Sequence, residues 1–179
     1  MLDPRLRFEH GVMARGLADV LVATSALREL SEIQRGSLIR VSIALFRRFE
    51  RHARAEEREV YPVLSNLLGD DRLAAAMTYD HRAVESGVAD LAATDPFDSP
   101  RLEALLYGLH ALVTAHIDKE EQLVFPLLES NGHRAPAGDG VLATTSEAVP
   151  QPQAGAPRWL LRVLRPNGNG ARAARHRRV

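Results

Sequence analysis

The feature that most constrains this chain is a motif that occurs twice, 64 residues apart, beginning at His52 and at His116. Both copies read His-x-x-x-Glu-Glu-x-x-Val-aromatic-Pro-x-Leu. In a helix of 3.6 residues per turn, a histidine and the glutamate four positions later lie about 40° apart, so both project from one side. The second glutamate of each copy, Glu57 or Glu121, lies about 140° from its histidine and is expected to face water.

Two such pairs on facing helices would bring two nitrogens and two oxygens to one point in a protein core. The pairs are His52 with Glu56 and His116 with Glu120. Imidazole and carboxylate ligands suit iron or manganese, and helical bundles hold pairs of such ions between facing helices. The repeat therefore predicts a two-metal site inside an all-α protein.

Two further histidines extend the pattern. The triplets Phe8-Glu9-His10 and Tyr79-Asp80-His81 each join an aromatic residue, an acid and a histidine, and each precedes one copy of the long motif. Glu85 follows His81 by four residues, whereas the first triplet has Ala14 at that distance. A lone histidine on an apolar face is more often a core residue than a ligand. Four inward histidines with three glutamates favour metal binding, because buried ionisable groups are costly unless they pair or bind metal.

Capping signals and apolar periodicity divide the first 132 residues into four helices. We expect them over residues 4–30, 32–68, 71–93 and 100–129. No segment alternates as a strand would, so we predict an up-down-up-down antiparallel four-helix bundle over residues 1–132. Pro62 is expected to kink the second helix. Tyr61 and Phe125, which precede the two motif prolines, are expected to pack at the end of the bundle.

Residues 133–179 differ in composition, with many Pro, Gly and Ala residues and eight arginines against two acidic residues. This composition predicts a disordered basic C-terminal tail as a second region. Residues 157–165 have the pattern of a short amphipathic helix, which could make weak contact with a membrane surface or a partner groove. A solvated tail without a partner is the alternative.

Several classes of function are excluded. The absence of cysteine rules out disulfides, thiolate zinc sites and iron–sulfur clusters. There is no Walker loop, dinucleotide fingerprint, serine nucleophile elbow or zincin pattern, and no specific nucleic-acid partner is predicted. No apolar run approaches the roughly 18 residues of a transmembrane helix, and the N-terminus lacks a signal-peptide profile, so we predict a cytoplasmic protein.

The sequence resembles the hemerythrin-like, or HHE cation-binding, family over roughly residues 1–130. The resemblance rests on His10, His52-x-x-x-Glu56, His81 and His116-x-x-x-Glu120. It implies two non-haem iron ions joined by an oxo or hydroxo bridge, with manganese or a mixed pair as the alternative. It also implies that Glu56 and Glu120 bridge the ions and that the histidines are terminal ligands. The complete set of expected metal ligands is His10, His52, Glu56, His81, Glu85, His116 and Glu120, and no catalytic residue separate from them is expected.

The chain departs from the oxygen-carrying members of that family at Glu85, where they have a fifth histidine. An anionic oxygen ligand favours Fe(III) over Fe(II), which disfavours reversible dioxygen storage. We therefore expect catalase-like reaction with hydrogen peroxide or a related small oxidant, as a stress defence. Non-enzymatic binding or sensing of dioxygen, nitric oxide or iron is the first alternative. A bundle that has lost its metal and serves as an interaction module is the second.

Overall fold

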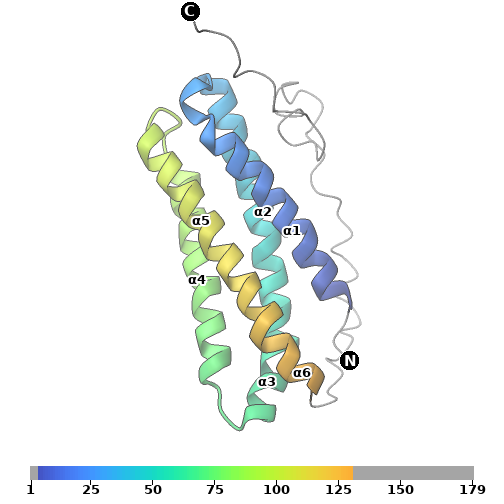
Figure 1. Ribbon diagram of the computed structural model, residues 1–179. Helices are drawn as coiled ribbons and strands as arrows, with labels where there is room; N and C mark the ends of the chain where they lie inside the picture. Colours follow the sequence, from blue (N-terminus) through green and yellow to red (C-terminus); the bar gives the residue numbers. More distant parts are fainter. Residues whose placement is uncertain (1–3, 131–179) are drawn as a thin grey trace, which may run out of the picture.

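The computed structural model describes residues 4–130, and all regular structure in this part of the chain is helical. The described residues form four long helices and shorter segments. Figure 1 shows the long helices side by side, with short helices continuing at one end of the molecule. The long helices are α1 (Pro4–Ser25), α2 (Glu32–Glu59), α4 (Arg72–Ala93) and α5 (Ser99–Lys119), and the short segments are the 3₁₀-helix η1 (Leu27–Glu29), α3 (Tyr61–Leu68), the π-helix η2 (Glu120–Val124) and α6 (Phe125–Ser130). The predicted all-α class is confirmed. The predicted tail, 133–179, and its helix at 157–165 lie outside the described residues.

Local chemistry sets the helix ends. Ser31 caps α2 in a reciprocal box, in which its side chain accepts from the backbone of Gln34 and the Gln34 side chain accepts from the backbone of Ser31. Asp98 caps α5 by accepting from the backbone N–H of Arg101. Gly69 ends α3 with a φ of 64°, a left-handed conformation that glycine adopts without strain.

The two motif prolines interrupt their helices in different ways. Pro62 has no N–H to donate, and α2 ends before it at Glu59, with α3 beginning at Tyr61. Before Pro126 the helix instead widens into the π-helical turn η2, in which the N–H of Phe125 donates to the carbonyl of Glu120. Despite this difference, matching positions of the two copies are buried, among them Tyr61 and Phe125.

The apolar core has two parts, and the polar residues of the motifs lie between them. The larger cluster fills the half of the molecule that contains η1, and the smaller one lies at the end formed by α3 and α6. In α4, for example, Met77 belongs to the smaller cluster and Val84 to the larger one, with His81 between them. Around the molecule, α2 packs against α1 and α4, and α5 packs against the same two helices. None of the helices in residues 4–130 is long and apolar enough to cross a membrane.

Candidate metal centre

Six of the seven side chains expected to be ligands meet between the two apolar clusters. They come from five helical segments, and none of the six residues is more than 3% exposed. These residues are His10 of α1, His52 and Glu56 of α2, His81 of α4, His116 of α5 and Glu120 at the start of η2. They form two groups of potential metal ligands that share Glu56.

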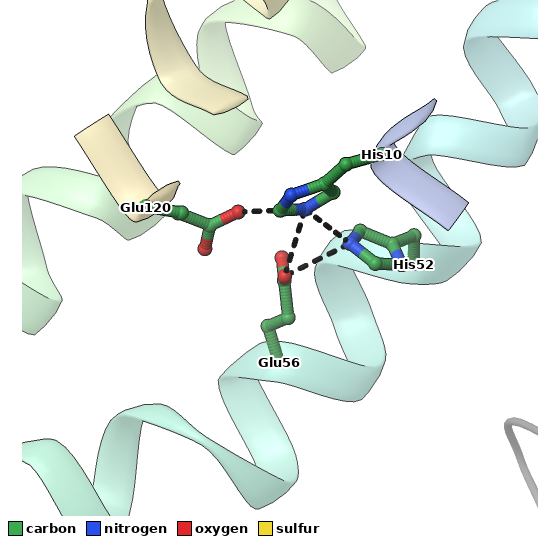
Figure 2. A group of neighbouring side chains, drawn as sticks. All are labelled: His10, His52, Glu56 and Glu120. Carbon is green, nitrogen blue, oxygen red and sulfur yellow. Dashed lines mark hydrogen bonds and ion pairs between the residues drawn. The ribbon is translucent and has the colours of Figure 1, made fainter. Parts of the chain in front are cut away.

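The first group consists of His10, His52, Glu56 and Glu120, and Figure 2 shows these four side chains pointing toward one another. The Nε2 atoms of His10 and His52 lie 3.0 Å apart. His52 Nε2 is 2.9 Å from Glu56 Oε1, and His10 Nε2 is 3.2 Å from Glu120 Oε2. Adjacent ligands of an octahedral ion with bonds of about 2.1 Å lie about 3 Å apart, so these spacings fit one ion.

The second group consists of His81, His116 and the other oxygen of Glu56. The Nε2 atoms of His81 and His116 are 3.0 Å apart, and Glu56 Oε2 lies 3.7 Å from His81 Nε2. Glu120 Oε2 is 3.6 Å from His116 Nε2. Glu56 therefore directs one oxygen to each group, as a carboxylate that bridges two ions must do. The second group has fewer protein ligands than the first.

The unsatisfied polar atoms of this site fit metal cations. Both oxygens of Glu56 and Oε2 of Glu120 are fully buried and have no hydrogen-bond donor. Buried carboxylates without donors are costly unless a cation neutralises them. The facing Nε2 atoms of each histidine pair also need a positive charge between them, because two lone pairs at 3.0 Å repel each other. The donor set of imidazoles and carboxylates suits iron.

The Nδ1 atom of each of these four histidines, which faces away from the site, is hydrogen-bonded to a carboxylate. The pairs are His52 with Glu9 (2.6 Å), His81 with Glu57 (2.7 Å), His10 with Glu121 (2.9 Å) and His116 with Asp80 (3.2 Å). A carboxylate accepts only, so Nδ1 carries the hydrogen and Nε2 points into the site. The expectation that Glu57 and Glu121 face water is wrong, because both lie at seams between helices, where they reach a histidine of the neighbouring helix.

Without metal, protons supply part of the missing charge at the first group. Burial lowers the pKa of His10, but the nearby carboxylates of Glu120 and Glu56 favour the protonated imidazole and outweigh it, so the pKa rises to about 9. For His52, burial is likewise outweighed by the negative charge of the adjacent Glu56 and by the hydrogen bond to Glu9, and the pKa rises to about 10. Burial and the charge of Glu56 raise the pKa of Glu120 to about 7.

The second group behaves differently. Burial and the neighbouring His81 lower the pKa of His116 to about 4, against the attraction of Glu56 and Asp80. Its imidazole is therefore neutral at pH 7, with the Nε2 lone pair available to a metal ion. The two halves of the repeat thus give electrostatically unequal groups.

Tyr61 belongs to the site, contrary to the expectation that it only packs at the bundle end. Its side chain is buried, and its hydroxyl donates to Glu120 Oε1 at 2.9 Å and lies 3.2 Å from His81 Nε2. Burial and the charges of Glu56 and Glu120 raise the pKa of Tyr61 far above its usual range, so the phenol stays protonated. Phe125, at the matching position of the second copy, stacks on His10 and has no hydroxyl.

The structure does not bring Glu85 into the site. Its side chain is 46% exposed and pairs with Arg54 of α2 at 3.0 Å. The inward line of α4 runs through Met77, His81 and Val84, which are buried, and Glu85 lies one position past this line toward α2. The expected ligand role of Glu85 is therefore corrected to a surface ion pair.

The sequence matches the family model described as the hemerythrin HHE cation binding domain over residues 1–143. No curated protein and no solved structure matches the chain.

Proposed function

Because this chain belongs to the hemerythrin HHE cation-binding family, we propose that its buried centre holds two iron ions and reacts with hydrogen peroxide or a related small oxidant. In this proposal the helices form the up-down-up-down bundle predicted from sequence, and the protein works in the cytoplasm. His10 and His52 would hold the first ion and His81 and His116 the second, with Glu56 and Glu120 shared between them. Two adjacent iron ions supply a two-electron redox couple, which is the number of electrons that one peroxide molecule gives or accepts.

The observation that carries the proposal is the hydroxyl of Tyr61 beside the group with fewer protein ligands. A small molecule bound there would meet a buried phenol that remains protonated. The hydroxyl now donates to Glu120 Oε1, and a rotation about its C–O bond would redirect that hydrogen toward an oxygen of the bound oxidant. A donor held in a dry site stabilises negative charge that develops on oxygen when the O–O bond breaks.

The peroxide reaction no longer draws support from Glu85. The Glu85 carboxylate pairs with Arg54 at the surface and adds no anionic ligand to either ion. Two buried carboxylates remain to favour the ferric state, Glu56 and Glu120. Reversible binding of dioxygen or nitric oxide would use the same group with fewer protein ligands, so the test must separate turnover from binding.

Replacing Tyr61 with phenylalanine is expected to leave the iron content unchanged and to slow oxygen release from peroxide about tenfold, the effect of losing one hydrogen bond of about 1.4 kcal/mol in the transition state. The measurement is oxygen evolution from iron-loaded protein, in which two peroxide molecules give one dioxygen and two waters. Tyr107→Phe is the matched control, because Tyr107 is a partly exposed tyrosine of α5 outside the site.

Each outcome of this experiment has a definite meaning. Unchanged turnover in Tyr61→Phe would remove the tyrosine from the proposal. Iron-loaded wild-type protein that binds nitric oxide or dioxygen but releases no oxygen from peroxide would contradict the enzymatic function and favour a binder or sensor.

A further inference from the structure

Four carboxylates surround the metal centre, and their connectivity forms a closed circle. Each is supplied by one helical segment to the histidine of the next segment around the bundle. The circle runs from Glu9 of α1 to His52 of α2, from Glu57 of α2 to His81 of α4, from Asp80 of α4 to His116 of α5, and from Glu121 of η2 back to His10 of α1. In none of the four pairs do the carboxylate and the histidine lie on the same helix.

We propose that these four residues form a carboxylate ring of positioning residues that sets the metal affinity and reduction potential of the centre, and that the surface cations Arg7 and Lys119 adjust it. The inference rests on the proposed iron binding, because it describes how this chain's own side chains act on that iron. Each carboxylate fixes the Nδ1–H form of its histidine and turns the Nε2 lone pair inward.

The carboxylate ring orients all four histidines, because each has one of its members as a partner. In each link, a carboxylate on one helix fixes the ring orientation of an imidazole on its neighbour. Glu9 is 6% exposed, and the side chains of Asp80, Glu121 and Glu57 are 15%, 27% and 36% exposed. The circle is therefore shielded from water most strongly at Glu9 and least at Glu57, and each bond ties two neighbouring helices together at the level of the metal.

Two ring members are connected to cations at the surface. Arg7 pairs with Glu121 and with Glu129, and its guanidinium lies 5.2 Å from the centre of the Phe125 ring. Lys119 pairs with Asp80. Each histidine group thus contains one histidine linked through a carboxylate to a half-exposed base: His10 in the first group and His116 in the second.

This arrangement predicts opposite effects for the two kinds of partner. A carboxylate on Nδ1 makes the imidazole a stronger electron donor and stabilises the higher oxidation state of a bound ion. Removing the negative charge of Asp80 should therefore raise the reduction potential. Removing the positive charge of Lys119 leaves Asp80 less compensated and should lower it. A general loss of packing would not shift the reduction potential in opposite directions in the two variants.

The test compares wild-type protein with Asp80→Asn, Asp80→Ala and Lys119→Met, all loaded with iron. Asp80→Asn keeps an accepting oxygen but loses the charge, so the potential is expected to rise with little loss of affinity. Asp80→Ala also loses the acceptor, and its iron affinity is expected to fall about 10- to 100-fold. Asp118→Asn is the control, because it makes the same change of charge at an exposed position of α5 beside Lys119.

Three readouts separate positioning from a general structural role. Iron affinity is measured by competition with a chelator, and the reduction potential by spectroelectrochemical titration. In the NMR spectrum of the paramagnetic protein, the exchangeable Nδ1–H signal of one metal-bound histidine should disappear in Asp80→Ala. If the Asp80 variants fold poorly, Glu121→Gln repeats the test at the first group. The reduction potential of this variant is expected to rise in the same way.

Shifts of Asp80→Asn and Lys119→Met in the same direction, or shifts no larger than that of Asp118→Asn, would overturn the ring. Wild-type protein that binds iron while all ring variants match it would contradict the ring and leave the proposed function intact. Wild-type protein that binds no iron would overturn both.

Discussion

Replacing Glu56 with alanine is expected to empty both metal positions at once. Its two oxygens face different histidine pairs, at 2.9 Å from His52 Nε2 and 3.7 Å from His81 Nε2. Removing a shared ligand should lower the affinity for iron by about 100-fold or more, beyond the 10- to 100-fold typical of partners that only orient a ligand. Metal analysis of protein expressed with ample iron measures the effect.

Glu85 provides the matched control for this substitution. Glu85→Ala removes a carboxylate of the same type from the surface pair with Arg54, and Glu85→His introduces the residue that the oxygen carriers have there. Both variants are expected to match wild-type protein in iron content, visible spectrum and peroxide turnover. A loss of iron in Glu85→Ala would contradict the position of this side chain, and full iron content in Glu56→Ala would contradict the shared carboxylate.

Removing the metal is expected to lower the melting temperature of the protein and to make its stability depend strongly on pH. Ligand at a thousand times its Kd stabilises a folded protein by about 4 kcal/mol, which corresponds to roughly 10–20 °C for a domain of this size. Thermal unfolding of metal-free and iron-loaded protein, followed by circular dichroism, measures the difference. Equal melting temperatures would contradict a buried metal site.

The pH dependence of the metal-free protein follows from the raised pKa values of His10 and His52, about 9 and about 10. Protons bound more tightly in the folded state stabilise it fully below the unfolded value near 6.5, and this stabilisation is lost as the pH rises through 9 to 10. The pKa of Glu120 is raised to about 7, so its contribution to folding stability is also lost as the pH rises, and this loss is complete just above neutrality. The melting temperature of metal-free protein should therefore fall between pH 7 and 10.

The iron-loaded protein should show little of this alkaline loss, because metal ions replace the protons on Nε2. On the acid side, the pKa of His116, lowered to about 4, acts in the opposite direction, and its contribution is lost as the pH falls from about 6.5 through 4. A metal-free protein whose melting temperature stays constant from pH 7 to 10 would contradict the coupling between these histidines and the buried glutamates.

The repeat predicts most of the centre because its spacing survives small errors in helix geometry. His52 and Glu56 are four residues apart on one helix, and the structure places both among buried neighbours. The same four-residue spacing gives the wrong answer for Glu85. A residue 40° from a histidine around the helix can lie either on the buried face or beyond its edge. On α4 the inward side next to His81 is occupied by Val84, which is fully buried.

The ring carboxylates and Tyr61 depend on neighbouring helices, which a single-helix argument does not contain. Glu57 is about 100° past Glu56, and whether that direction meets water or a seam depends on where α4 lies. The acids that precede His10 and His81 in the triplets were visible in the sequence as part of the repeat. Only the arrangement of the helices shows that Glu9 is hydrogen-bonded to His52 and Asp80 to His116. Tyr61 and the matching Phe125 are both buried, one after a helix break and the other after a π-helical turn, and only the tyrosine brings a hydroxyl to the site.

The most direct test of the account is a crystal structure of protein expressed with ample iron, with anomalous diffraction recorded at the iron edge and metal content measured on the same sample. Two iron ions per chain are expected, one beside His10 and His52 and the other beside His81 and His116, with Glu56 contacting both. A sample that contains zinc alone, no metal, or iron at a position that does not involve Glu56 would contradict this expectation.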